Sequence, residues 1–256
     1  MLTSNNNDNL LNYALRNGDD RLILAHRLGE WCGSAPILEE DIALTNVALD
    51  VLGQSILFYK YAAELEGTDN DEDFYAYKRG EQEFRNLLLT EQPNEDFAYT
   101  IARQFYFDTF DYYFFDELTK SKNSNLSAIA EKSIKEAKYH LRHSSQWMLR
   151  LGDGTTESNS RINDACGYLW MYTGELFENQ SGDEVLIESG IIPDLSLLHD
   201  NWLNSILQIK KEAGIALPDE GQFMQKGGRI GKHTEYLGHI ISDMQYLSRV
   251  FPNAKW

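Results

Sequence analysis

The spacing between histidines and carboxylates decides what metal chemistry this chain can do. On a helix, a glutamate three residues before a histidine lies on the same face, and two such Glu-x-x-His pairs with two further carboxylates hold a pair of metal ions between four helices. The residues three positions before the six histidines are Ile23, Ala137, His140, Ser196, Ile230 and Tyr236. None is a carboxylate, so the sequence contains no complete Glu-x-x-His pair.

The segment 134–148, IKEAKYHLRHSSQWM, comes nearest to a metal-binding helix. Its apolar stripe places Ala137 inward, with His140 one turn later on nearly the same face. A glutamate at 137 would complete the pair, but a methyl group cannot bind a metal, and Glu136 points about 100° away around the helix. We predict a hydrogen-bonded core histidine at 140, with metal ligation as the alternative.

A polar ladder interrupts the apolar segment between Ile42 and Leu65. Asp50 and Gln54 stand four residues apart on it, and Val51 stands three before Gln54. Val51-x-x-Gln54 is therefore a second Glu-x-x-His position with both ligands replaced, because a carboxamide is a weak ligand for iron or manganese.

Asp108 is a further carboxylate in apolar surroundings, within the aromatic run 97–118. Burying an unpaired carboxylate costs several kcal/mol. Asp50 and Asp108 are therefore expected to face water, meet a cation, take up a proton or mark a former metal site.

The remaining motifs predict little chemistry. The glycine-rich turn that carries Lys226, Arg229 and Lys232 does not match a phosphate-binding loop. We predict a solvated loop there, with contact to a partner or an anion as the alternative. No G-x-S-x-G motif occurs, and the pair Asp19 and Asp20 is interpreted as surface charge.

The sequence predicts an all-α fold, since apolar residues recur every three or four positions and only five prolines occur. The expected helices span 9–16, 19–32, 37–66, 71–91, 95–120, 125–150, 157–178, 194–212 and 231–250. Short connections between them predict antiparallel neighbours, as in a bundle. Residues 1–8, rich in asparagine, are expected to form a disordered tail before a single domain over 9–256.

Composition limits the environment of the protein. Forty acidic and twenty-three basic residues give a net charge of -17, which disfavours nucleic-acid binding. We interpret this acidity as a contribution to solubility, with docking of a more basic partner as the alternative. Two cysteines form no disulfide framework, and no window approaches the roughly 20 apolar residues of a membrane span. We therefore expect a cytoplasmic protein without membrane association.

Several longer segments are specific enough to indicate a family. They are HRLGEWCG at 26–33, ALDVLGQ at 48–54, NLLLTEQPN at 86–94, IARQ at 101–104, KEAKYHLRHS at 135–144, LGDGT at 151–155, LWMYTGELF at 169–177, GKHTEYLG at 231–238 and MQYL at 244–247. With these segments the chain resembles, over residues 19–256, the family of C subunits of ring 1,2-phenylacetyl-CoA epoxidases, the PaaC type.

The resemblance implies a ferritin-like four-helix bundle core with additional helices. It also implies a structural subunit that pairs with a related catalytic A subunit in a bacterial multicomponent monooxygenase. In that family the A subunit holds the di-iron centre and binds phenylacetyl-CoA, while a reductase supplies electrons from NADPH. The residues expected to line the corresponding degenerate site here are Glu30, Asp50, Val51, Gln54, Asp108, Glu136, Ala137 and His140.

We predict a non-catalytic subunit of a phenylacetyl-CoA epoxidase complex, without a cofactor of its own and with di-iron in its partner. Two alternatives remain open at this point. One is a metal-free module that binds a CoA thioester or regulates the complex. The other is an atypical di-metal oxidase that uses Glu30, Asp50, Asp108, Glu136 and His140.

Overall fold

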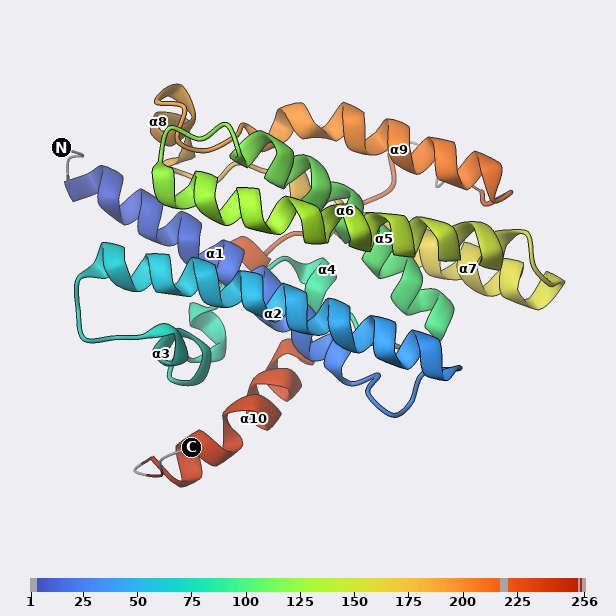
Figure 1. Ribbon diagram of the computed structural model, residues 1–256, viewed down its shortest axis with the longest axis horizontal. Coiled ribbons are helices and arrows are strands. Elements are labelled where there is room, and N and C mark those ends of the chain that lie inside the picture. The colour runs from blue at the N-terminus through green and yellow to red at the C-terminus, as the bar shows by residue number, and fades with distance from the viewer. Residues whose placement is uncertain (1–3, 217–220, 253, 255–256) are drawn as a thin grey trace. The chain divides into compact units, whose positions relative to one another are not determined.

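The computed structural model describes residues 4–216, 221–252 and 254, and every regular element within them is a helix (Figure 1). The predicted all-α, ferritin-like fold class is confirmed. Internal contacts divide the chain into two compact units, which we call unit 1 (Met1–Gln92 with Gly227–Trp256) and unit 2 (Pro93–Lys226). The single domain over 9–256 stays a prediction.

Unit 1 is built on a pair of long antiparallel helices. Its elements are α1 (Ser4–Gly29), α2 (Leu38–Glu66), α3 (Glu72–Tyr77), η1 (Glu81–Glu83), α4 (Leu88–Glu91), η5 (Gly228–Ile230) and α10 (Glu235–Val250). Helices α1 and α2 lie side by side (Figure 1). Gly18 lets them approach closely, because a Cβ there would lie 2.5 Å from the Tyr59 ring. The sequence predicted two helices, 9–16 and 19–32, with a break at Gly18, but α1 is continuous through this residue.

The beginning of α1 differs from the disordered tail predicted over residues 1–8. The helix begins at Ser4, and the Asn7 side-chain amide donates to the Leu65 carbonyl oxygen at 2.9 Å. This bond ties the first turns of α1 to the end of α2. Residues 1–3 lie outside the described part of the chain.

The predicted helix 71–91 is replaced by three short elements, α3, η1 and α4. The reason is a competition for backbone donors. The amide of Arg85 donates to Asp19 at 2.8 Å, and the amide of Leu87 donates to Asp20 at 2.7 Å. Because these N–H groups bind carboxylates of α1, they are not available to a continuous helical ladder.

Unit 2 surrounds the aromatic helix α5. Its elements are α5 (Phe97–Leu118), α6 (Ser124–Gly152), α7 (Thr156–Leu169), η2 (Trp170–Tyr172), η3 (Gly174–Phe177), α8 (Asp183–Glu188), η4 (Leu195–Leu198) and α9 (His199–Glu212). Helices α6, α7 and α9 pack on α5, and residues 100–111 are all buried. The predicted helix 157–178 ends at Leu169 and continues as 3-10 turns.

The expectation that no apolar window approaches the length of a membrane span is wrong. Within the described residues α2 is long and apolar enough to cross a membrane by length and composition, with a mean hydropathy of 1.4 in its most apolar window. Of that window, 44% is buried in the structure. A core helix of a soluble protein passes the same test, so α2 is a helix with one buried face and one apolar face that remains exposed.

Candidate metal centre

The polar ladder of α2 meets an arginine in unit 1. Gln54 is 1% exposed, and its side-chain oxygen accepts a hydrogen bond from Arg21 Nε at 3.2 Å. Arg21 is also 1% exposed, donates to the Asn17 carbonyl oxygen at 3.0 Å, and stands 5.0 Å from the centroid of the Phe58 ring. A buried guanidinium thus binds the side chain of one of the residues that the sequence predicted to line a degenerate metal site.

The other candidates in unit 1 are distributed along the helix pair. Val51 is buried and Asp50 is half-buried, both on α2. Glu30 follows the end of α1, where its carboxylate pairs with Arg27 at 2.8 Å and its side chain is 46% exposed. Because Glu30 lies nine residues beyond Arg21, the two are separated by about 13 Å along the chain at the helical rise. The structure therefore does not bring Glu30 to Gln54.

In unit 2 the structure brings together Asp108 of α5 and His140 of α6. They are 3% and 2% exposed. Gln104 Nε2 donates to Asp108 Oδ1 at 3.4 Å. Burial raises the pKa of the Asp108 carboxyl to about 7, although His140 and Ser144 nearby act in the opposite direction. A carboxyl with this pKa takes up a proton near neutral pH. Proton uptake was one of the four possibilities expected from the sequence for Asp108.

The two other candidates of α6 differ in what they present to the core. Ala137 is fully buried, as the apolar stripe predicted, and presents a methyl group to the core. Glu136, one residue before Ala137, is half-buried.

These residues do not fit a di-iron centre. Gln54 binds a guanidinium, whose positive charge opposes a nearby metal cation, and the Ala137 side chain has no donor atom. In the part of the chain that the structure describes, no group of three or more His, Cys, Asp or Glu residues is arranged to hold a metal ion.

Sequence reasoning missed a set of buried ion pairs in unit 1. Asp19 is fully buried, forms an ion pair with Arg79 and accepts a hydrogen bond from Tyr59 at 2.6 Å. Asp20 is 2% exposed and pairs with Arg229 at 2.8 Å. Burial raises the pKa of Asp20, while Arg229 lowers it. The interpretation of Asp19 and Asp20 as surface charge is therefore wrong.

The glycine-rich turn was predicted to be a solvated loop, but its centre around Arg229 is buried. The Arg229 side chain is 6% exposed and engaged by Asp20, so it is not available to a partner or an anion. A Cβ at Gly228 would lie 2.1 Å from the Asn86 carbonyl oxygen, which explains a glycine at this close approach. In unit 2, Lys226 forms an ion pair with Glu178 at the surface. Lys232 is exposed.

The turn is also fixed by a buried carboxylate of α4. Glu91 is fully buried and its oxygens bind His233 Nδ1 at 2.6 Å, the Thr234 amide at 2.8 Å and the Thr234 hydroxyl at 2.6 Å. The C-terminal segment is thereby held to α4 within unit 1.

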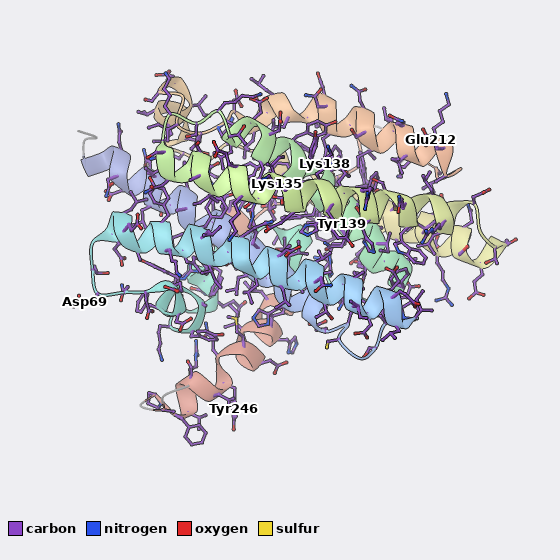
Figure 2. All side chains as sticks on the ribbon, in the orientation of Figure 1. Asp69, Lys135, Lys138, Tyr139, Glu212 and Tyr246 are labelled. Atoms are coloured by element: carbon purple, nitrogen blue, oxygen red, sulfur yellow. The ribbon has the colours of Figure 1, made fainter. Side chains whose placement is uncertain are left out.

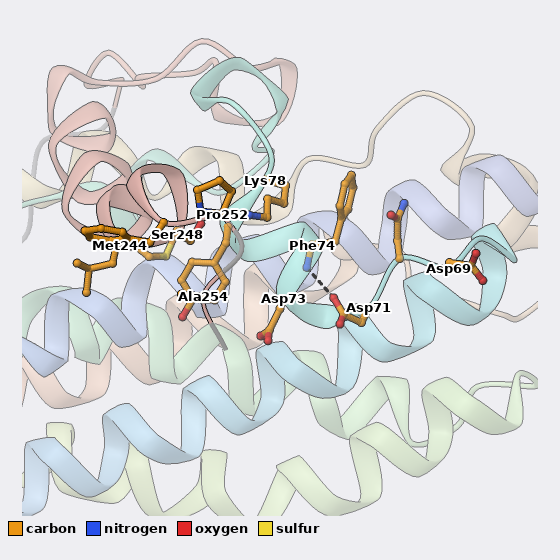
Figure 3. A pocket seen from close by; sticks show the side chains of 13 residues that line it. Asp69, Asp71, Asp73, Phe74, Lys78, Met244, Ser248, Pro252 and Ala254 are labelled. Carbon is orange, nitrogen blue, oxygen red and sulfur yellow. Dashed lines mark hydrogen bonds between the residues drawn. The ribbon is translucent and has the colours of Figure 1, made fainter. Parts of the chain in front are cut away.

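A cavity in unit 1 lies away from all of these candidates. It has a volume of about 570 Å³ and is lined by α3, the turn before it and the end of α10 (Figure 3). Asp71 on its wall caps α3, accepting from the Phe74 amide at 3.0 Å (Figure 3). None of the residues predicted for the metal centre lines this cavity.

A family model described as phenylacetic acid catabolic protein matches residues 1–256. The chain belongs to this family. It is also 48% identical over 244 residues to the C subunit of 1,2-phenylacetyl-CoA epoxidase of Escherichia coli (strain K12), covering 95% of this chain and 98% of the relative.

Membership in the phenylacetic acid catabolic protein family confirms the resemblance found in the sequence segments. It accounts for a ferritin-like helical fold and indicates a role in phenylacetate catabolism.

Proposed function

We propose that this chain is a non-catalytic structural subunit of a multicomponent phenylacetyl-CoA epoxidase. In this proposal it pairs with and stabilises a di-iron catalytic A subunit in the cytoplasm during aerobic phenylacetate degradation, while further subunits and a reductase complete the complex. The named relative, an epoxidase C subunit that matches nearly the whole chain, supports the assignment.

The observation that carries the non-catalytic role is the contact between Arg21 and Gln54. A di-iron site has to gather several anionic ligands around two cations. Here a permanently charged guanidinium occupies the helix pair beside a ligand position, hydrogen-bonded at 3.2 Å and shielded from water. Removing a metal ligand alone could leave an empty pocket, whereas this arrangement stabilises the helix pair without a metal.

The exposed face of α2 supports a role in assembly. The large apolar side chains Leu38, Ile42, Leu49 and Ile56 are 72%, 53%, 60% and 36% exposed. At 100° per residue they fall within about 40° of one another around the helix, and they span about 27 Å along it. A continuous apolar stripe of this kind is typical of a surface that another helix covers. The exposed side chains of this stripe are aliphatic.

Co-purification followed by metal analysis tests the proposal. The tagged chain is co-expressed with the catalytic subunit of the same complex, and the two polypeptides are then separated and analysed for iron. We expect iron in the catalytic subunit, background iron in this chain, and a large loss of epoxidase activity when this chain is omitted. Near-stoichiometric iron in this chain would favour the atypical oxidase instead. Full activity without the chain would contradict a stabilising role.

Substitutions on the exposed face sharpen the test. The double variant Leu49→Arg with Ile56→Arg is expected to lose the catalytic subunit during purification. The control variant Leu197→Arg with Phe223→Arg changes two side chains that are 73% and 74% exposed outside α2, and it should retain the catalytic subunit. Equal retention by both variants would exclude the α2 face as the contact.

A CoA thioester module is the second possibility. Calorimetric titration of the chain with phenylacetyl-CoA, alone and with the catalytic subunit, distinguishes the two, because a structural subunit is expected to give no heat on its own.

A further inference from the structure

Helix α6 carries a cationic outer face on a strongly acidic protein. Its residues 124–152 include five basic side chains and two acidic ones, an excess of three positive charges, although the whole chain has a net charge of -17. We call the following set the α6 cationic stripe: Lys132, Lys135, Lys138 and Arg142, together with Tyr139 among them. All five side chains are exposed.

The spacing of the stripe places it on one side of the helix. Steps of three and four residues keep the five side chains within about 120° around the axis and within about 15 Å along it. The buried positions of α6, which include Ser133, Ala137 and Ser144, lie on the opposite side. Lys135, Lys138 and Tyr139 are marked along α6 in Figure 2.

The cations of the stripe differ from several other surface cations in the described residues in having no close ion pair. Elsewhere on the surface, cations find carboxylates nearby, as in the pairs Lys120 with Glu117 at 2.6 Å and Arg161 with Glu157 at 2.6 Å. Across the described residues, none of the four cations of the stripe forms an ion pair with a carboxylate. Glu131, one residue before Lys132, is exposed and lies within the same sector of the helix, at the N-terminal end of the stripe.

The centre of the stripe is ordered by aromatic contacts. Tyr139 is 42% exposed, and its ring stacks on that of His143 with centroids 6.4 Å apart and an interplanar angle of 25°. The Arg142 guanidinium lies 5.7 Å from the centroid of the Tyr139 ring. Tyrosine and arginine are among the side chains most enriched at the energetic centres of protein interfaces, and prior ordering lowers the entropy lost on binding.

We propose that the α6 cationic stripe is a docking surface for a carboxylate-rich face of another protein subunit. This inference rests on the proposed function, since it requires that the chain works within a complex. A protein face fits better than a small anion, because the stripe follows the convex side of one helix. A nucleic acid fits less well, because its continuous phosphate backbone would run beyond the stripe onto a chain with a net charge of -17, whereas a local carboxylate-rich face needs to meet the stripe alone.

Lysine footprinting of the assembled complex tests the inference. The chain alone and the complex formed with the catalytic subunit and the remaining components are treated briefly with an acylating reagent at low ionic strength, and modified lysines are counted by mass spectrometry. We expect Lys135 and Lys138 to lose reactivity at least about fivefold in the complex and to regain it in high salt, because exposed charge pairs are screened. The exposed lysines Lys122 and Lys211 should not change.

The outcomes separate this inference from the proposed function. If a complex forms and the stripe lysines react as they do in the free chain, the docking surface is excluded while the structural role stands. If no complex forms, both proposals fail. Equal protection by phosphatidylglycerol vesicles in place of protein components would assign the stripe to an anionic membrane and would also overturn the inference.

A charge-reversal variant gives an independent measurement. Lys135→Glu, Lys138→Glu and Arg142→Glu together are expected to weaken binding to the complex at least about tenfold and to reduce its salt dependence, mainly through a slower association rate. Lys78→Glu, Lys122→Glu and Lys211→Glu together make the same change in net charge at exposed positions away from the stripe and should leave the affinity within about twofold. Equal weakening by both variants would indicate general repulsion and not a docking surface.

Discussion

Replacing the buried Asp108 carboxyl with a neutral amide should stabilise the protein most strongly above neutral pH. Burial raises the pKa of Asp108 in the folded chain to about 7, from an ordinary value of 3.8. Folding therefore favours the protonated carboxyl. The contribution to stability is largest below the unfolded-state pKa, declines as the pH rises, and reaches its minimum above the folded-state pKa.

The size of this effect follows from the difference between the two pKa values. The difference between about 7 and 3.8 corresponds to about 4 kcal/mol at high pH. At pH 5 only about 1.5 to 2 kcal/mol of this cost is present, so the advantage of Asp108→Asn over the wild type should grow by about 3 kcal/mol between pH 5 and pH 8.

Urea unfolding of both proteins across this pH range measures the difference directly. Asp116→Asn is a control on the same helix, where the side chain is 53% exposed and the change should stay within about 0.5 kcal/mol at every pH. A pH-independent difference between Asp108→Asn and the wild type would refute the reasoning, because the carboxyl would then not titrate in this window.

Three further predictions concern the supports of the fold. Arg79→Leu leaves the fully buried Asp19 carboxylate without its cation and should lower the free energy of unfolding by about 3 to 5 kcal/mol, measured by urea denaturation; a loss below about 1 kcal/mol would mean that the pair is not formed. Gly228→Ala puts a Cβ 2.1 Å from a backbone oxygen and should lower the free energy of unfolding by at least about 1 to 3 kcal/mol. The control Gly167→Ala places its Cβ in open space on a helix and should be neutral or stabilising. Thermal unfolding of both variants measures the difference. Incubation with a chelator should leave the thermal midpoint of the isolated chain unchanged, and a clear decrease would indicate a structural metal.

The sequence was sufficient for the fold class and for the long helices. The period of apolar residues predicted 37–66, 95–120 and 125–150 within a few residues of α2, α5 and α6. The same period placed Ala137 inward, where it is fully buried. These features are local, because each is specified by residues within a few turns of one helix.

The tertiary structure decided which charges are buried and what they bind. Asp20 and Arg229 stand 209 residues apart, and Arg79 lies 60 residues from Asp19. No spacing rule connects such residues, since their pairing depends on how the chain brings α1, α4 and the glycine-rich turn together within unit 1. The pairing of Arg21 with Gln54, 33 residues away on the facing helix, was missed for the same reason.

The sequence by itself determined that no Glu-x-x-His pair is complete and that position 137 carries no ligand atom, because the chemistry of a methyl group does not depend on the fold. Only the tertiary structure decided what Gln54 binds in unit 1, the buried guanidinium of Arg21. It also decided that one carboxyl in unit 2 titrates near neutral pH. Both follow from burial, since a charge removed from water is stabilised or neutralised only by the groups that the fold places around it.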